Sequence, residues 1–141
     1  MNKLLAVAAA LLPAVAFAEL PIVQLNAGMH LIHAELAADM GSRMQGLMHR
    51  KSMAVNNGML FIFDDASTQC MWMKNTFIPL SVAFLDERGT ILNIEDMKPQ
   101  TEASHCSTGP ARYALEMNQG WFAQRGIKAG TKLGGFEKLR K

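Results

Sequence analysis

The chain has 141 residues, of which 50% are hydrophobic and 18% are charged, so it can bury a core of ordinary size within one domain. Its 14 basic and 12 acidic residues give a net charge of +2, and the Lys and Arg residues are scattered rather than grouped in runs. This balance argues against nucleic-acid binding and against binding to an anionic membrane surface.

The first 18 residues have the pattern of a cleavable signal peptide. Lys3 supplies a positive charge, an apolar run continues to Val15, and Ala16 and Ala18 are the small residues that signal peptidase reads. The apolar stretch is about 15 residues long, shorter than the roughly 20 that a helix needs to cross a bilayer. We therefore expect residues 1–18 to be removed, the mature protein to be periplasmic or secreted, and no membrane span to remain in it.

Export also gives meaning to the two cysteines of the chain, Cys70 and Cys106. In an oxidising compartment such a pair is more often a disulfide than a redox or zinc motif. Two unpaired thiols, one of them buried, are the alternative. The sequence thus predicts a disulfide between Cys70 and Cys106.

The mature chain, residues 19–141, has the pattern of one β-rich globular domain without internal repeats or linkers. Alternating or continuous apolar runs predict a series of short strands. These strands are expected at 29–37, 59–63, 69–74, 80–85, 90–94 and 112–117, with a last edge strand at 131–136.

The remaining segments are assigned to helices, a turn and a loop. Apolar residues at helical spacing behind a capping Asp or Asn predict short helices over 39–50 and 119–125. Residues 86–89 form a tight turn that makes a hairpin of the strands beside it, and residues 98–111 form a long loop that contains Cys106. The expected fold class is mainly β, a small sandwich or partly closed barrel with two short helices.

Five sequence blocks give the chain a family resemblance. They are GLM-x-R (46–50), GMLFIF (58–63), MWMKNT-x-IPL (71–80), FLDERG (84–89) and YALEMNQGW (113–121). In this order they resemble the domain-of-unknown-function family numbered 192, from about residue 29 to residue 133. The resemblance implies a compact β-sandwich of jelly-roll type and no established activity. Members of that family usually carry Asp after Pro-Leu, where this chain has Ser81.

The segment around Trp72 is the strongest candidate for a binding site. On a strand, Trp72 and Lys74 share one face, and Asn75 and Thr76 follow directly. An aromatic plate beside an ammonium, an amide and a hydroxyl group suits a small anionic or carbohydrate-like ligand. The alternative is that Trp72 belongs to the core and the polar residues cap a strand end.

Two further residues are placed at the rim of this expected cleft. Glu116 lies between Leu115 and Met117 on the opposite strand face, where it could oppose Lys74 or Arg50 across the cleft. Charge pairs in clefts are where perturbed pKa values arise. The alternative for Glu116 is a residue that faces solvent or forms a surface ion pair.

The methionines suggest copper as a less favoured ligand. Met71 and Met73 flank Trp72 in a pattern compatible with soft Cu(I) ligation. Met40, Met44 and Met48, however, have the spacing of a helix that packs on a core. We therefore expect the methionines to serve packing, and no bound metal or cofactor.

The function that these patterns favour is a non-enzymatic, monomeric binding module for a small polar ligand or an extracytoplasmic partner. A hydrolase-like enzyme that uses the same cleft is the alternative. No nucleophile elbow, zinc-protease motif or phosphate-binding loop is present. His105 beside Cys106 is the only pair that resembles a nucleophile with its base.

Overall fold

A computed structural model describes residues 10, 11, 13 and 18–140 of the chain. The expected signal peptide therefore falls largely outside the described residues. The elements are β1 (Ile22–Ala27), β2 (His30–Ala37), α1 (Met40–Gln45), β3 (Asn57–Ser67), β4 (Cys70–Met71), β5 (Leu80–Leu85), β6 (Ile91–Met97), β7 (His105–Cys106), β8 (Ala111–Asn118), α2 (Trp121–Gln124) and the 3₁₀ turn η1 (Glu137–Leu139). None of the described helices is long and apolar enough to cross a membrane.

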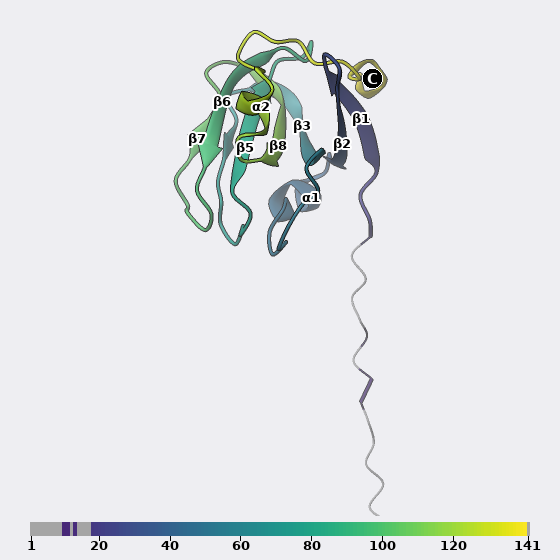
Figure 1. The fold of residues 1–141 in the computed structure, drawn as a ribbon. Coiled ribbons are helices and arrows are strands. Elements are labelled where there is room, and N and C mark those ends of the chain that lie inside the picture. Colours follow the sequence, from purple (N-terminus) through teal and green to yellow (C-terminus); the bar gives the residue numbers. More distant parts are fainter. Residues whose placement is uncertain (1–9, 12, 14–17, 141) are drawn as a thin grey trace, which may run out of the picture.

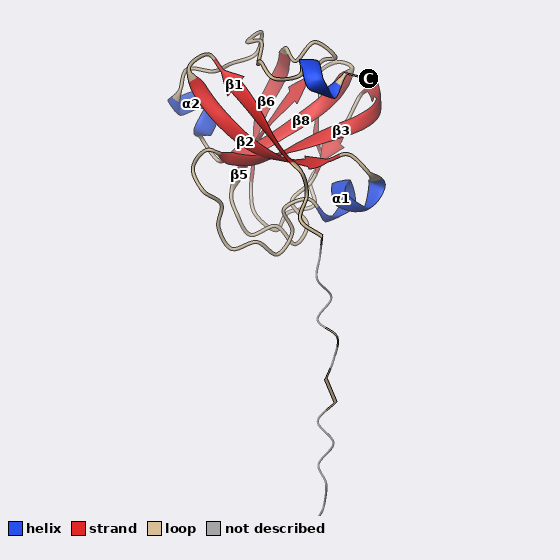
Figure 2. Cartoon of the chain, turned by 90° about the vertical axis from the view of Figure 1, so that its right-hand side faces the viewer, coloured by secondary structure: helices blue, strands red, loops and turns tan. Residues whose placement is uncertain are grey.

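Six strands form one mixed sheet in the order β1-β2-β3-β8-β5-β6, and β4 pairs with β7 in a separate two-stranded sheet. Only β2 and β3 run parallel; the other pairs are antiparallel. β1 and β6 lie at opposite edges of the sheet (Figure 1). The two helices lie on opposite sides of the molecule (Figure 2).

The sheet is not a closed barrel, although its two edges approach each other at one end. Lys132 forms a bridge with Thr90, just before β6, and Gly134 forms one with Asn26 of β1. Each bridge joins only a single pair of residues, so residues 131–136 do not form the edge strand that we expected there. The mainly β, sandwich-like fold class with two short helices is confirmed.

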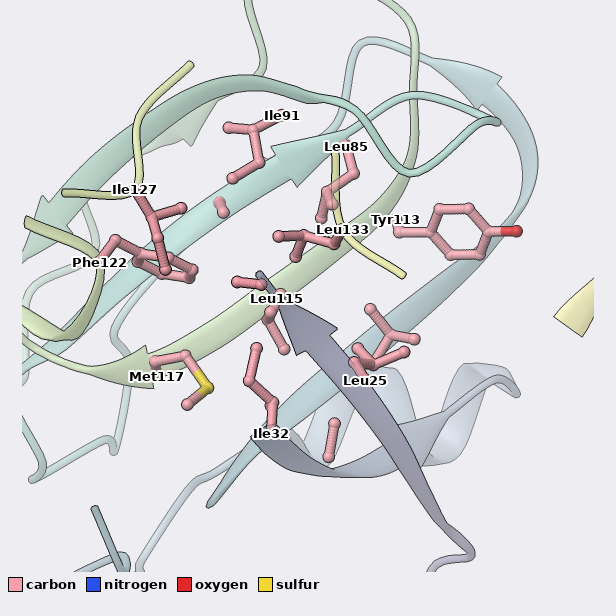
Figure 3. Close-up of a cluster of buried hydrophobic side chains, with 14 of the residues drawn as sticks. Leu25, Ile32, Leu85, Ile91, Tyr113, Leu115, Met117, Phe122, Ile127 and Leu133 are labelled. Atoms are coloured by element: carbon pink, nitrogen blue, oxygen red, sulfur yellow. The ribbon is translucent and has the colours of Figure 1, made fainter. Parts of the chain in front are cut away.

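β8 lies at the centre of the sheet and divides the core into two clusters. Tyr113, Leu115 and Met117 point into the larger cluster, which β1, α2 and residues 127–136 cover (Figure 3). Ala114, on the other face, belongs to a second cluster with Phe61 and other side chains of β3 and β5. Strand alternation thus buries both faces of β8.

The expected elements agree best where the hydrophobic pattern is local. The strand at 80–85 has the expected bounds and forms the expected hairpin with β6. The expected helix at 39–50 is shortened to α1, because Asp39 caps its start and Gly46 ends it with φ of 47°. The expected strand at 69–74 is reduced to the two residues of β4. β1 was not expected.

The disulfide between Cys70 and Cys106 is present and joins β4 to β7. The two cysteines are direct partners in this small sheet. The bridge ties the long loop to the segment that continues into Trp72. Because its sulfur is oxidised, Cys106 is not a nucleophile, and the enzyme interpretation that paired it with His105 is wrong.

We expect reduction of this disulfide, or the double substitution Cys70→Ala and Cys106→Ala, to lower the free energy of unfolding by up to about 4 kcal/mol. The bond closes a loop across 36 positions and restricts the unfolded chain. Urea unfolding of the oxidised, reduced and doubly substituted proteins measures the difference. Equal unfolding midpoints in all three would show that the bridge does not stabilise the fold.

Candidate functional site

A small cavity lies on the face of the sheet that carries the second cluster. It is enclosed by the end of α1 and the turn after it, by the segment that follows β4, and by β8. Its volume is about 30 Å3, room for about two waters or one ion. The residues that matter most in its lining are Met44, Met48, Met71, Trp72, Thr76 and Glu116.

Among the described residues that line this cavity, Glu116 alone has a carboxyl group. It is 3% exposed, and its neighbours across the sheet are Met59 of β3 and Val82 of β5. None of the ion pairs among the described residues involves it. In the described part of the chain, every fully buried side-chain oxygen or nitrogen has a hydrogen-bond partner. The Glu116 carboxyl group has no such partner, so its oxygens are not fully enclosed by protein and face the cavity that Glu116 lines.

Burial sets the charge of this carboxyl group. Removal from water disfavours the ionised form and raises the pKa of Glu116 to about 8. At neutral pH the group is therefore mostly protonated, and it can donate a hydrogen bond to whatever enters the cavity. The alternative that placed Glu116 toward solvent is wrong, because both faces of β8 are covered around it.

Trp72 stands at the mouth of the cavity and is 42% exposed. The Lys74 ammonium nitrogen lies 5.3 Å from the centre of the indole ring, so the two side chains share a face as the alternation predicted. The alternative that placed Trp72 in the core is wrong. Lys74 itself is exposed and lines neither the cavity nor the groove beside it.

Asn75 and Thr76 have different roles after Trp72. Asn75 is exposed with a left-handed φ of 52°, and its carbonyl oxygen accepts a hydrogen bond from the His49 amide at 2.9 Å. Thr76 is buried and lines the cavity, and its hydroxyl group donates to the Lys74 carbonyl oxygen at 3.0 Å. The structure thus brings Thr76 to Trp72 and Glu116 but leaves Asn75 outside.

Arg50 does not lie at the rim of this cavity. Its guanidinium donates two hydrogen bonds to the Glu35 carboxylate, at 2.5 and 2.7 Å. These bonds raise the pKa of Arg50 above its ordinary value, and the side chain borders a different hollow, on the other side of the 45–48 turn. The expected arrangement of Glu116 opposite Arg50 or Lys74 is therefore wrong.

A larger groove of about 360 Å3 adjoins the cavity, and Trp72 lines both. Its polar residues include Arg43, Asp64, Asp65 and Gln69. The Arg43 guanidinium donates to the carbonyl oxygens of Ala38 and Ile62 at 2.7 and 3.0 Å, and lies 3.6 Å from the Asp64 carboxylate. The groove therefore combines an aromatic ring with carboxylate and amide groups, and its one cation is already paired.

Sequence reasoning missed Asp65, Gln69 and the two methionines of the turn region. The expected strand at 59–63 stopped before Asp64 and Asp65, although β3 continues through both. Met44 was assigned to packing because of its helical spacing. The signal against that assignment was the pair of glycines, Gly41 and Gly46, which make α1 too short to cover a core.

Ser81 occupies the position where the family resemblance implies Asp. It is buried, accepts a hydrogen bond from the Gly120 amide at 2.9 Å, and donates to the Asp96 carboxylate at 2.6 Å. Asp96 is its direct partner on β6. At this position the chain thus has a hydroxyl group that is hydrogen-bonded to a carboxylate on the neighbouring strand.

The fold and this site define a small, disulfide-linked, mainly β protein with a buried acid beneath an exposed tryptophan. The family model DUF192, which carries the description "uncharacterized ACR", matches residues 22–135, and the chain belongs to this family. No curated protein matches the chain.

Two solved structures are similar over most of the chain. One is described provisionally as a transcription regulator from Sinorhizobium meliloti 1021; it is 39% identical, with a TM-score of 0.77, and the match covers 87% of this chain and 98% of that one. The other is a protein of unknown function from Novosphingobium aromaticivorans DSM 12444, 32% identical, with a TM-score of 0.78 and coverage of 82% and 86%.

We expect Glu116→Gln to change how stability depends on pH. The carboxyl group has a pKa near 4.5 when unfolded and about 8 when folded, so the wild type loses stability as pH rises through this interval and is level outside it. The substitution removes that loss. Relative to the wild type, Glu116→Gln should gain about 3 to 5 kcal/mol between about pH 4.5 and pH 8.5.

Urea unfolding at both pH values measures this gain. Glu87→Gln, in the exposed turn between β5 and β6, is the matched control for the loss of one negative charge. A difference between Glu116→Gln and the wild type that stays constant with pH would contradict the assigned titration.

Proposed function

We propose that the protein is an exported, non-enzymatic binding module for a small polar ligand that docks in the groove beside Trp72. The observation that supports this most directly is the position of Trp72, which is 42% exposed and lines both the groove and the cavity. A large aromatic side chain kept half-exposed beside hydrogen-bonding groups is the usual composition of a small-molecule site. An extracytoplasmic protein partner remains the alternative occupant.

The charges of the groove favour a carbohydrate-like ligand over an anionic one. Asp64 and Asp65 are exposed at its wall, whereas the Arg43 guanidinium is occupied by backbone carbonyl groups. An anion in the groove would therefore meet two carboxylates and a cation that is already paired, since Lys74, whose ammonium group lies over the Trp72 ring, is not among the residues that line the groove. Sugar hydroxyl groups, in contrast, can donate to the carboxylates while the ring stacks on Trp72.

One observation favours the hydrolase-like alternative. Glu116 is a protonated, buried carboxyl group of the kind that serves as a general acid. Such chemistry commonly needs a second acid or a nucleophile in the same site. Glu116 is the only carboxyl group that lines the cavity, and Cys106 is bound in the disulfide. We therefore place binding ahead of catalysis.

Export is part of the proposal, and the disulfide supports it because stable disulfides form in oxidising compartments. We expect cleavage after Ala18. Intact-mass analysis of the periplasmic or secreted protein should find a chain that begins at Glu19. Recovery of the full-length chain from the membrane fraction would contradict the assignment of a signal peptide.

We expect neutral mono- or disaccharides, rather than small carboxylates or phosphates, to raise the melting temperature. A ligand at about 100 times its Kd stabilises the folded state by about 2.7 kcal/mol. Thermal unfolding with a panel of both ligand classes measures the shift. Substrate turnover assays on the same panel separate binding from hydrolysis.

The matched variants for this experiment are Trp72→Leu and Phe77→Leu. Phe77 is 44% exposed, close to the 42% of Trp72, but lines neither the groove nor the cavity. The sugar-induced shift should disappear in Trp72→Leu and persist in Phe77→Leu. Larger shifts with anions, or a shift unchanged in Trp72→Leu, would overturn the carbohydrate-like ligand.

A further inference from the structure

The exposed methionines of α1 do not fit the role that their spacing predicted. α1 has no buried residues, and Met40 and Met44 are 75% and 64% exposed. Exposed methionines gain nothing from core packing, so the explanation that assigned them to the core is wrong. Met44 lines the cavity together with Met48 and Met71.

The size of this cavity points to an ion rather than an organic molecule. Its volume is about 30 Å3, whereas the groove beside it measures about 360 Å3. A sugar ring or an amino acid does not fit into such a space, but one ion or about two waters do. The cavity shares Met44, Met71 and Trp72 with the adjoining groove, whereas Met48, Thr76 and Glu116 line the cavity but not the groove.

The groups around the cavity have a consistent chemical character. Met44, Met48 and Met71 supply thioethers, which are soft ligands. Trp72 supplies a π system that attracts cations, and Glu116, 3% exposed and in no ion pair among the described residues, supplies one potential negative charge.

Arg43 also borders the cavity and must be accounted for in any cation site. Its guanidinium is directed to the carbonyl oxygens of Ala38 and Ile62 and to the Asp64 carboxylate. These partners already balance its charge, so it does not neutralise Glu116.

We propose that this cavity binds one soft monovalent cation, Cu(I) or its analogue Ag(I), through the thioethers of Met44, Met48 and Met71, with the Glu116 carboxylate as counter-charge. Binding forms coordinate bonds from the thioether sulfurs to the ion and involves no change of oxidation state. The proposal reverses the expectation that the methionines serve only packing. It concerns a different subsite from the sugar groove.

Hard or borderline cations fit the same groups poorly. Ca²⁺ and Mg²⁺ require six or more oxygen ligands, whereas the cavity offers one carboxyl group and the Thr76 hydroxyl, whose proton is donated to the Lys74 carbonyl oxygen. Zn²⁺ prefers His and Cys, and the described part of the chain holds no group of three His, Cys, Asp or Glu residues that could bind a metal.

The test titrates the mature, oxidised protein with Ag(I) in chloride-free buffer, followed by calorimetry and tryptophan fluorescence. The protein suits this probe because both of its cysteines are in the disulfide, so no free thiol competes with the thioethers. We expect saturable binding of one ion per chain and quenching of the Trp72 emission. Anaerobic Cu(I), supplied with a competing chelator, should give the same stoichiometry.

The informative variant is Met48→Leu with Met71→Leu, and the matched control is Met29→Leu with Met40→Leu. Met29 and Met40 are 89% and 75% exposed and do not line the cavity. Leu replaces Met with little change in volume, so both variants should fold. The affinity for Ag(I) should fall at least about tenfold in the first variant and stay unchanged in the control. Glu116→Gln should also weaken binding.

Absence of saturable binding would overturn the proposal, and so would equal affinity in the two double variants. Far-ultraviolet circular dichroism confirms that each variant is folded. Sugar-induced stabilisation measured on Met48→Leu alone separates the two subsites, because Met48 lines the cavity but not the groove, whereas Met71 lines both. A retained sugar shift with weakened Ag(I) binding supports the metal site, and a lost sugar shift contradicts a separate subsite.

Discussion

The alternation of β8 is the constraint on which both the core and the site depend. This central strand is paired on both edges, with β3 and with β5, and both of its faces are covered by side chains. A polar residue in the middle of this strand must therefore be buried on one face or the other, whereas Arg112 and Asn118 near its ends are half-buried. Glu116 shares the face of Ala114, so its carboxyl group lies in apolar surroundings. Such a group survives in a fold only if a cavity, a partner or a proton relieves its desolvation.

The wall opposite β8 is held by means other than a long strand ladder. β4 has only two residues, and the chain beyond it is fixed by single hydrogen bonds, such as Met73 to Thr101 and Gln100 to Thr76. The disulfide adds a covalent tie between this wall and the long loop. Trp72 thus lies on a loop that the disulfide at Cys70 holds in place, and this arrangement suits a half-exposed aromatic side chain at a binding site.

The parts of the fold that could be predicted from sequence are those whose pattern is local. The apolar run of β5, the turn after it and the alternation of β8 were sufficient to place these elements within about two residues. β1 was missed although its apolar residues Val23, Leu25 and Ala27 alternate with Gln24 and Asn26; only its pairing with β2 is non-local. The parallel pairing of β2 with β3 is likewise a non-local feature. Strand 69–74 was overestimated because the alternation of Met71, Trp72 and Met73 continues where the hydrogen-bond ladder has ended.

The site was predicted only in part. The surroundings of Glu116 and Arg50 depend on contacts between distant segments, which a local sequence pattern does not show. Alternation correctly put Trp72 and Lys74 on one face, but it says nothing about which strands bury both faces, so it left open whether Glu116 faces a cleft or solvent. Charge complementarity suggested Arg50 as its partner, yet Glu35 is nearer and takes both hydrogen bonds. The result is an acid without a basic partner, which costs stability at neutral and higher pH. Glu116 weakens the fold, whereas Gln, an amide of the same size, would not. Such a residue is typical of a position that serves binding rather than folding.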